Sequence, residues 1–403
     1  MQTITLDELD VTGRPLGCEP DTAAALSDTG LVEVRPHASG RYTLVPRGVV
    51  GAVRIGDLQV QVTPKDKVGL TRMLFLLGYA QDPGWRDHDV IASAEHDLWP
   101  ALAESLMRQA ERALQHGVLQ GYRPTDDALR TVRGRIRIGD QLSRRPGLAM
   151  PLEVTYDEYT QDITENRLLR TALRRMLGVP GLGQGVRARL GHLDARLTGV
   201  RILAAAGRIP SWQRTRANNR YHSVLRLAEV IIRHGSTEVG DGDLTMAAFV
   251  VNMAKVYEDF VTTALAESLQ RMGGHPHAQF PRRLDAPSAA PGRLSMYIDL
   301  VHVVNGRPTV MFDAKYKAAR ADGSYSNADH YQMLAYCTAL GLNRAWLVYA
   351  QGVSAPTVRR IVNTDISIVE YPLDLRASPP DLLGQVDHLV DQAWALSAPG
   401  GTS

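Results

Sequence analysis

Two apolar segments near residue 300, each associated with one aspartate, constrain the fold of this chain most strongly. Met296–Val304 and Val310–Phe312 are apolar enough to be central strands of a sheet that is covered on both faces. Asp299 lies inside the first segment, and Asp313 directly follows the second. A carboxylate in such a strand is costly to bury unless it is paired or binds a cation. The pattern therefore predicts a buried acidic site on neighbouring strands.

The turn between the two segments decides whether the carboxylates meet. A two-residue turn at Asn305–Gly306 would place Asp299 opposite Phe312, so that Asp313 would point to the other face of the sheet. A three-residue loop over Asn305–Arg307 would place the two aspartates directly opposite each other. We expect the three-residue loop, because it brings the polar groups together.

The residue types in this hairpin fit hydrolysis of a phosphodiester bond. Asp299 and Asp313 can hold Mg²⁺ through hard oxygen ligands, with Mn²⁺ as a substitute, and the backbone carbonyl of Ala314 can supply another ligand. Lys315 lies two residues beyond Asp313 and therefore shares its face of the strand. A lysine there can orient the attacking water and stabilise the developing negative charge. These residues are the expected catalytic and metal-binding centre.

Two predicted helices offer further candidates for the site. Glu258 lies on an otherwise apolar stripe of the predicted helix Met246–Met272, which suggests a metal ligand or a supporting acid, although a solvated helix edge is the alternative. Gln332 and Tyr336 are four residues apart on the predicted helix Ala328–Leu340 and share one face. They could position a phosphate or the lysine, but ordinary packing would explain them almost as well.

The length of 403 residues favours two or three domains. We expect an α/β fold with an α+β N-terminal part. The expected divisions are a β-rich N-terminal region at 1–120, a mixed region at 121–240 and an α/β domain at 241–403 that carries the predicted hydrolytic site; the resemblance described below implies that the first is a partner-docking region and the last a nuclease domain. The middle region contains the basic segment Arg130–Arg137, which suits either a solvated strand edge or a contact with DNA backbone or a protein partner. A turn-rich linker is expected at Gly235–Asp243.

Composition excludes several classes of protein. Hydrophobic residues make up 44% of the chain, which indicates globular domains, and the net charge of +2 decides little. Cys18 and Cys337 are too far apart in sequence to indicate a disulfide framework, and no apolar run has transmembrane length, so we expect a cytoplasmic protein with no membrane partner. The chain has no G-x-x-x-x-G-K-[ST] motif, so any nucleotide motor must be a partner.

Beside these local arguments, the motifs resemble known families. The hairpin with Asp299, Asp313 and Lys315 resembles the catalytic core of PD-(D/E)xK nucleases, with Ile298 in place of the proline of the motif, and the Gln332-x-x-x-Tyr336 spacing resembles their RecB-like branch. The wider pattern, over about residues 40–350, resembles McrC. Four segments carry that resemblance: Val132-Arg133-Gly134-Arg135-Ile136, Asp157-Glu158-Tyr159-Thr160, Glu165-Asn166-Arg167-Leu168-Leu169 and Tyr257-Glu258-Asp259-Phe260-Val261.

The resemblance implies a DNA endonuclease subunit of a restriction or phage-defence complex. McrC proteins work with McrB, an AAA+ GTPase ring that recognises methylated DNA; the N-terminal part of McrC docks on the ring and stimulates it, and the C-terminal domain cuts. The implied substrate is double-stranded, modified DNA, and two nuclease domains would pair to cut both strands. Two alternatives stay open: a stand-alone PD-(D/E)xK nuclease in DNA repair or processing, and a non-catalytic adaptor of an AAA+ ring.

Overall fold

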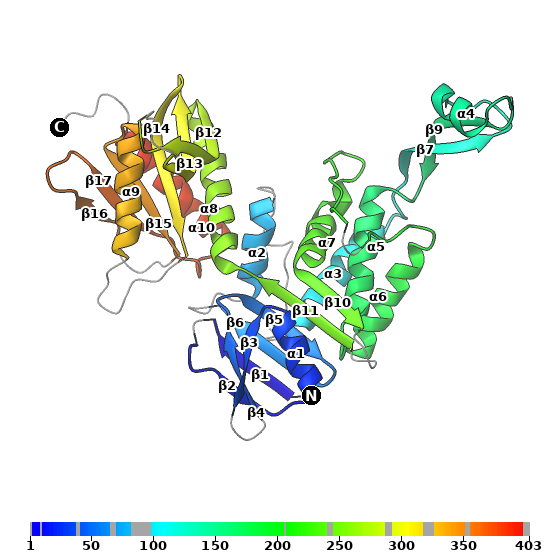
Figure 1. Ribbon diagram of the computed structural model, residues 1–403, viewed down its shortest axis with the longest axis horizontal. Helices are drawn as coiled ribbons and strands as arrows, with labels where there is room; N and C mark the ends of the chain where they lie inside the picture. Colours follow the sequence, from blue (N-terminus) through cyan, green and yellow to red (C-terminus); the bar gives the residue numbers. More distant parts are fainter. Residues whose placement is uncertain are drawn as a thin grey trace. The chain divides into compact units, whose positions relative to one another are not determined.

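The computed structural model describes ten stretches of the chain: residues 2–8, 10–37, 41–64, 70–81, 98–204, 207–239, 245–286, 292–316, 326–350 and 355–397. They pack into two compact units, coloured along the chain in Figure 1. Unit 1 contains Met1–Val53, Leu58–His96 and Val250–Ser403, and unit 2 contains Arg54–Asp57 and Asp97–Phe249. The division at residues 120 and 240 stays a prediction. No helix among the described residues is long and apolar enough to cross a membrane.

The N-terminal part of unit 1 is rich in β-structure, as the sequence predicts. Strand β1 pairs in parallel with β6, which neighbours β5, and β4 lies between β2 and β3 in a separate small sheet. The elements are β1 (Gln2–Asp7), β2 (Arg14–Leu16), α1 (Pro20–Asp28), β3 (Val32–His37), β4 (Arg41–Pro46), β5 (Val50–Ile55), β6 (Leu58–Thr63) and α2 (Leu70–Gln81). Helix α2 packs against α8 (Met253–Leu269), where Phe75 and Tyr79 contact the ring of Phe260.

A six-stranded mixed sheet forms the C-terminal part of unit 1. The strands are, in spatial order, β12 (His275–Arg283), β13 (Ser295–Val304), β14 (Arg307–Lys315), β15 (Arg344–Tyr349), β17 (Ser367–Pro372) and β16 (Thr357–Arg360). Strands β12, β13 and β14 are antiparallel neighbours, and β14, β15 and β17 are parallel. Helix α9 (Asn327–Leu340) lies between β14 and β15 in the chain. The predicted α/β arrangement is confirmed.

Helices cover both faces of this sheet, as Figure 1 shows. On one face, Met333 and Cys337 of α9 pack against Val301, Met311 and other buried residues of the central strands. On the other face lie α8 and α10 (Pro379–Ala395). There the hydroxyl of Tyr257 donates to the carbonyl of Val348, and the ring of Trp394 packs against His302. The central strands are therefore buried on both sides, and their apolar runs follow from that burial.

The predicted helix over Met246–Met272 is wrong in its first part. Residues Thr245–Val251 form strand β11, which pairs with β10 (Gly235–Val239), where the sequence suggested a linker. Helix α8 begins only at Met253, and the side chain of Asn252 caps it by accepting a hydrogen bond from the backbone N–H of Lys255 at 3.1 Å. The β-branched and aromatic residues of β11 favour a strand, and the Asn cap marks the true start of the helix.

Unit 2 is a helical body that carries a β-ribbon. Its helices are α3 (Leu98–Leu114), α5 (Thr164–Leu177), α6 (Gln184–Arg196), the 3-10 turn η3 (Asn219–Tyr221) and α7 (His222–His234). The ribbon consists of β7 (Gly121–Leu129), β8 (Arg135–Ile136), α4 (Ile138–Arg144) and β9 (Leu152–Thr160), and it extends away from α5, α6 and α7 in Figure 1. Helix α5 begins at Thr164, and the preceding residue, Ile163, makes no side-chain capping bond.

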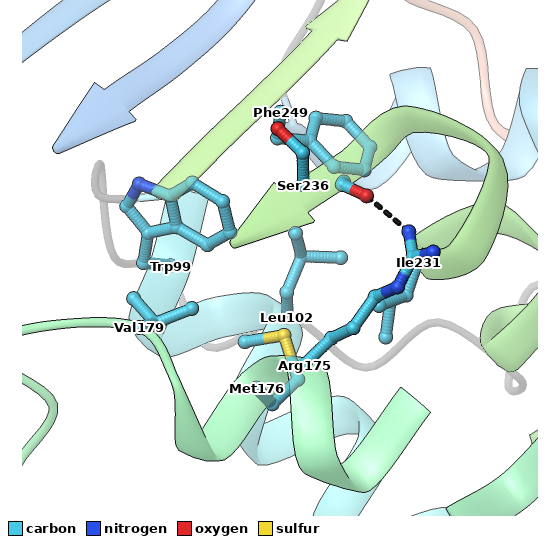
Figure 2. Close-up of a pocket in the computed structure, with 9 residues that line it drawn as sticks. Trp99, Leu102, Arg175, Met176, Val179, Ile231, Ser236 and Phe249 are labelled. Atoms are coloured by element: carbon cyan, nitrogen blue, oxygen red, sulfur yellow. Dashed lines mark hydrogen bonds between the residues drawn. The ribbon is translucent and has the colours of Figure 1, made fainter. Parts of the chain in front are cut away.

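A half-buried arginine, Arg175, ties α5 to the β10 hairpin inside unit 2. Figure 2 shows the side chain of Arg175 extending from α5 towards Ser236, near the start of β10. Its guanidinium donates to the carbonyl oxygens of Ile232, at 2.7 Å, and of Gly235. Burial lowers the pKa of Arg175, although backbone carbonyls receive its hydrogen bonds. The cavity beside it is about 10 Å³, the space of about one water molecule, so this is a structural contact and not a ligand pocket.

Asp162 joins the ribbon to the helical body of unit 2. Its carboxylate pairs with Arg123 of β7, with Arg167 of α5 at 2.6 Å and with Arg201 at 2.8 Å. Burial alone would raise the pKa of Asp162, but the hydrogen bonds from Arg167 and Arg201 outweigh it and lower that pKa. The root of the ribbon is therefore fixed by one buried acid that holds three arginines.

Candidate active site

The hairpin of β13 and β14 has a two-residue turn, so the predicted three-residue loop is wrong. Asn305 and Gly306 both have left-handed backbones, with φ of 51° and 76°, as a tight hairpin turn requires. Val304 consequently pairs with Arg307. Continued without interruption, this register would separate the two aspartates by one residue and place them on opposite faces.

A β-bulge restores the expected pairing of the carboxylates. The register shifts between His302 and Val303, because His302 pairs with Val310 and leaves Thr309 as the extra residue. The hydroxyl of Thr309 donates to the carbonyl of His302 at 3.0 Å, which holds the bulge. Beyond it Leu300 pairs with Phe312, so the next positions along the two strands are Asp299 and Asp313. The aspartates face each other because of the bulge.

Both oxygens of Asp299 accept hydrogen bonds. The backbone N–H of Ala314 donates to Oδ2 at 3.0 Å, and the amide of Gln279 donates to Oδ1 at 3.3 Å. Burial raises the pKa of Asp299; the hydrogen bond from Ala314 opposes this rise, and the charge of Glu258 adds to it. Asp299 is thus a positioned carboxylate whose negative charge is only partly compensated.

Asp313 and Lys315 form an ion pair at the centre of the site. Asp313 is 1% exposed, and its Oδ2 lies 2.5 Å from Nζ of Lys315. Burial, together with the charge of Asp299, raises the pKa of Asp313 to about 7. Burial disfavours the charged lysine, but the carboxylates of Asp313 and Asp299 outweigh it and raise the pKa of Lys315. Lys315 therefore stays positively charged beside two carboxylates that repel each other.

The ligand set around the two aspartates fits a hard divalent cation. Apart from its ion pair, the buried Oδ2 of Asp313 has no hydrogen-bond partner among the described residues. The N–H of Ala314 points to Asp299, while the carbonyl of Lys315 accepts from Ala350 on the other side. Because successive carbonyls of a strand point to opposite sides, the carbonyl of Ala314 faces Asp299.

Few protein ligands converge at this point. No group of three or more His, Cys, Asp or Glu side chains able to hold a metal occurs in the part of the chain that the structure describes. A cation between Asp299 and Asp313 would therefore complete its shell with the Ala314 carbonyl, water and substrate oxygens. Mg²⁺ commonly binds in this way, through one or two carboxylates and several retained waters.

Glu258 is connected to Asp299 through a residue that the sequence did not single out. The amide of Gln279 donates to Oε1 of Glu258 at 3.0 Å and also to Asp299. Glu258 lies at the margin of the buried face of α8, with 27% of its side chain exposed, and it also pairs with Lys255. Its role as a metal ligand stays a prediction. Gln279 was missed because no strand was predicted over β12.

Gln332 and Tyr336 act on strand β13. The amide of Gln332 donates to the hydroxyl of Tyr336 at 2.6 Å, and that hydroxyl donates to the carbonyl of Tyr297 at 2.9 Å. Burial, and then the charge of Asp313, raise the pKa of Tyr336. These bonds fix the backbone two residues before Asp299. A direct contact of the pair with phosphate stays a prediction.

A second residue that was missed is Asp329, in the first turn of α9. It is 4% exposed and accepts a hydrogen bond from the hydroxyl of Tyr349 at 3.4 Å. Its charge raises the pKa values of both Asp313 and Lys315. An acid in the first turn of a predicted helix is a usual feature of helix starts, so the sequence gave no reason to assign it to the site.

The comparisons with known proteins agree with this architecture. The family described as McrBC 5-methylcytosine restriction system component matches residues 44–350, which is most of the chain. The chain belongs to this family. The membership expected from the sequence motifs is confirmed, and the match contains every candidate site residue from Glu258 to Tyr336. None of the curated proteins compared with the chain matches it.

One solved structure shows the same fold. A chain of the Thermococcus gammatolerans assembly of McrB AAA+ hexamers with bound McrC aligns with a TM-score of 0.60 and 16% identity, covering 97% of this chain and 100% of that chain. A chain of the cryo-EM structure of the Thermococcus gammatolerans McrBC complex has a TM-score of 0.40 and 18% identity, over 66% of this chain and 88% of that chain. The first likeness establishes the fold; the second is too low to carry an argument.

Proposed function

We propose that this McrBC-family chain is the DNA endonuclease subunit of a restriction complex and hydrolyses phosphodiester bonds with the help of Mg²⁺. One observation carries the proposal: a β-bulge sets Asp299 opposite Asp313, and Lys315 lies 2.5 Å from the buried carboxylate. A structural ion pair needs only one acid. A second acid beside it that raises the pKa of the first is what a cation site between them would require.

The chain's own residues divide the work of hydrolysis. Mg²⁺ bound by Asp299, Asp313 and the Ala314 carbonyl, with Glu258 as a supporting acid, would polarise the scissile phosphate and help a water lose its proton. Lys315 orients the attacking water and stabilises the charge that develops on the phosphate. The hydroxyl of Tyr336, which accepts a hydrogen bond from Gln332, donates to the backbone of β13 and so fixes the position of Asp299.

We further propose that an AAA+ ring drives this nuclease. The chain contains no phosphate-binding loop of its own. The similar fold in Thermococcus gammatolerans belongs to an assembly whose McrB AAA+ hexamers have McrC bound. By analogy, the partner here is an McrB-like GTPase, and the substrate is modified double-stranded DNA. Two nuclease domains would then pair for a double-strand break.

The tip of the ribbon in unit 2 is a candidate surface for that ring. Its apolar side chains are exposed, and α4 has no buried residue. The exposed fractions are Val132 61%, Ile138 67%, Leu142 67%, Leu148 60% and Met150 52%. Two arginines of the ribbon, Arg137 and Arg145, are held by ion pairs with the buried Glu153. An apolar tip suits a protein partner better than DNA backbone.

The central test uses the reconstituted complex with the partner ring, modified DNA and Mg²⁺. Asp299→Ala or Lys315→Ala should abolish cleavage and leave the stimulation of the partner's GTPase intact. Cleavage that survives both substitutions would overturn the assignment of the site. A chain that stimulates the ring but never cuts, even unmutated, would be a non-catalytic adaptor. Cleavage by the purified chain alone would favour the stand-alone nuclease.

The docking surface has its own test. Leu142→Glu places a charge on the apolar tip and should lower GTPase stimulation and cleavage together, while cation binding by the isolated chain stays unchanged. Val362→Glu is the matched control, because Val362 is 82% exposed and lies in unit 1. Equal GTPase stimulation by the two variants would exclude the tip as the contact and return attention to the N-terminal region 1–120.

A further inference from the structure

Gln279 has a backbone conformation that is unusual for its residue type. Its φ is 48°, in the left-handed region that L-residues other than Asn and Asp rarely adopt. Its neighbours in β12 keep their pairing with β13, since Ala278 pairs with Leu300 and Phe280 with Ile298. Gln279 therefore lies directly opposite Asp299. The strained residue is at the level of the proposed catalytic carboxylate.

Strand β13 changes its buried face at this same level. Residues three apart on a regular strand point to opposite faces. Ile298 and Val301 nevertheless belong to one buried cluster under α9, and Phe280 of β12 packs against it. The alternation is therefore broken between Ile298 and Val301, next to Gln279. Glycine would adopt this left-handed backbone conformation without strain. The presence of glutamine therefore suggests that its side chain has a function here.

The side chain of Gln279 donates to both acids on this side of the site. Its Nε2 lies 3.0 Å from Oε1 of Glu258 and 3.3 Å from Oδ1 of Asp299. The other oxygen of Asp299 is held by the N–H of Ala314. Because each carboxylate oxygen has two lone pairs, both oxygens of Asp299 can still bind a cation while they accept these bonds.

We propose that Gln279 is a positioning residue for the cation site: it holds Asp299 and Glu258 at a fixed separation, and the strained backbone is what brings its amide between them. This inference rests on the proposed function of the site. Partners of metal ligands fix the orientation of those ligands and so raise the affinity for the metal. Strain that persists at such a position is typical of functional sites, where the surrounding structure enforces it.

Calorimetric titration of the full-length chain with Mn²⁺ tests the proposal without an activity assay. Gln279→Met removes both donors but keeps an unbranched side chain of similar size, so the backbone strain is unchanged. We expect about 10- to 100-fold weaker Mn²⁺ binding, the usual effect of losing a partner of a metal ligand. The unmutated affinity in this variant would overturn the inference.

A second substitution separates positioning from structural support. Gln279→Gly removes the donors and also relieves the left-handed strain, so it should raise the melting temperature and still weaken Mn²⁺ binding. Asn363→Gly is the matched control, because Asn363 has φ of 59° in the turn before β17. Because asparagine tolerates this conformation, the control should change the melting temperature little and leave Mn²⁺ binding unchanged. If Gln279 had only a structural role, Gln279→Gly would raise the melting temperature and leave Mn²⁺ binding unchanged.

The reference variant is Asp313→Asn, which removes a proposed ligand. If the unmutated chain binds Mn²⁺ and Asp313→Asn abolishes that binding, the proposed cation site is supported. The Gln279 variants then test only the positioning role of Gln279. If the unmutated chain shows no Mn²⁺ binding that depends on Asp313, the proposed function fails, and the role of Gln279 fails with it.

Discussion

Replacing Asp313 by asparagine should make the cation-free protein more stable. Asp313 is 1% exposed and faces the negative charge of Asp299. Asparagine has nearly the same shape and removes the charge. Because the attraction of Lys315 for Asp313 is lost as well, the gain is the net balance of burial and repulsion against that ion pair. The raised pKa of Asp313 reflects this balance.

The magnitude follows from the pKa of Asp313. A rise from 3.8 to about 7 corresponds to an upper limit of about 4 kcal/mol, at about 1.4 kcal/mol per pKa unit. The carboxyl group binds its proton more tightly in the folded state, so the free energy of unfolding falls as the pH rises from about 4 to about 7 and is constant above that. The gain from Asp313→Asn should therefore reach its full size at pH 8 and be less than about 2 kcal/mol at pH 5.

Scanning calorimetry in EDTA at pH 8 and pH 5 measures this difference. Asp365→Asn is the control, because Asp365 is exposed and belongs to the same unit. Its effect should be small at both pH values. Mg²⁺ added at pH 8 should stabilise the unmutated chain and not Asp313→Asn. If Asp313→Asn is less stable than the unmutated chain at pH 8, or if its gain is the same at pH 5, the reasoning about a destabilised carboxylate is refuted.

Three further outcomes are expected. Lys315→Met should abolish DNA cleavage by the complex and retain Mn²⁺ binding, because both aspartates remain; loss of binding would make Lys315 part of the cation site. Tyr336→Phe removes the donor to the Tyr297 carbonyl and should cost about 1 kcal/mol in thermal denaturation and lower kcat without changing KM. Asp162→Asn should destabilise unit 2 by about 1 kcal/mol above pH 5, since three arginines that are partly exposed lose the carboxylate they share. The unmutated chain should lose the same stability as the pH falls below about 4, because the folded state lowers the pKa of Asp162.

The sequence predicted the pairing of the two aspartates correctly, but from the wrong feature. For Asp299 and Asp313 to lie opposite each other, the hairpin needs one residue more than a two-residue turn provides. The sequence analysis places this extra residue in the turn. The structure keeps the tight Asn305–Gly306 turn and inserts Thr309 as a bulge. A bulge depends on the contacts of both strands with their neighbours, so no local motif distinguishes it from a longer loop.

Strand β12 was not predicted, and the contact of Gln279 with the acids was missed with it. Only two of its positions are even partly buried, so the strand shows no apolar alternation, and Pro276 and Pro281 suggest a loop. Prolines are tolerated because β12 is the edge strand of the sheet. Glu258 could be placed near the site because it lies on a clear helix. Its link to Asp299 is made by the amide of Gln279 on β12, the edge strand that the sequence analysis did not predict.

The location of a bound cation tests the central claim most directly. Crystals of the chain soaked in Mn²⁺ would show the ion by its anomalous scattering. We predict one peak within coordination distance of the carboxylates of Asp299 and Asp313, beside the carbonyl of Ala314, and no such peak in Asp313→Asn. An ion bound elsewhere, or an Asp299–Asp313 pair that stays free of Mn²⁺ at saturating concentration, would contradict the account of this hairpin as a cation-dependent nuclease site.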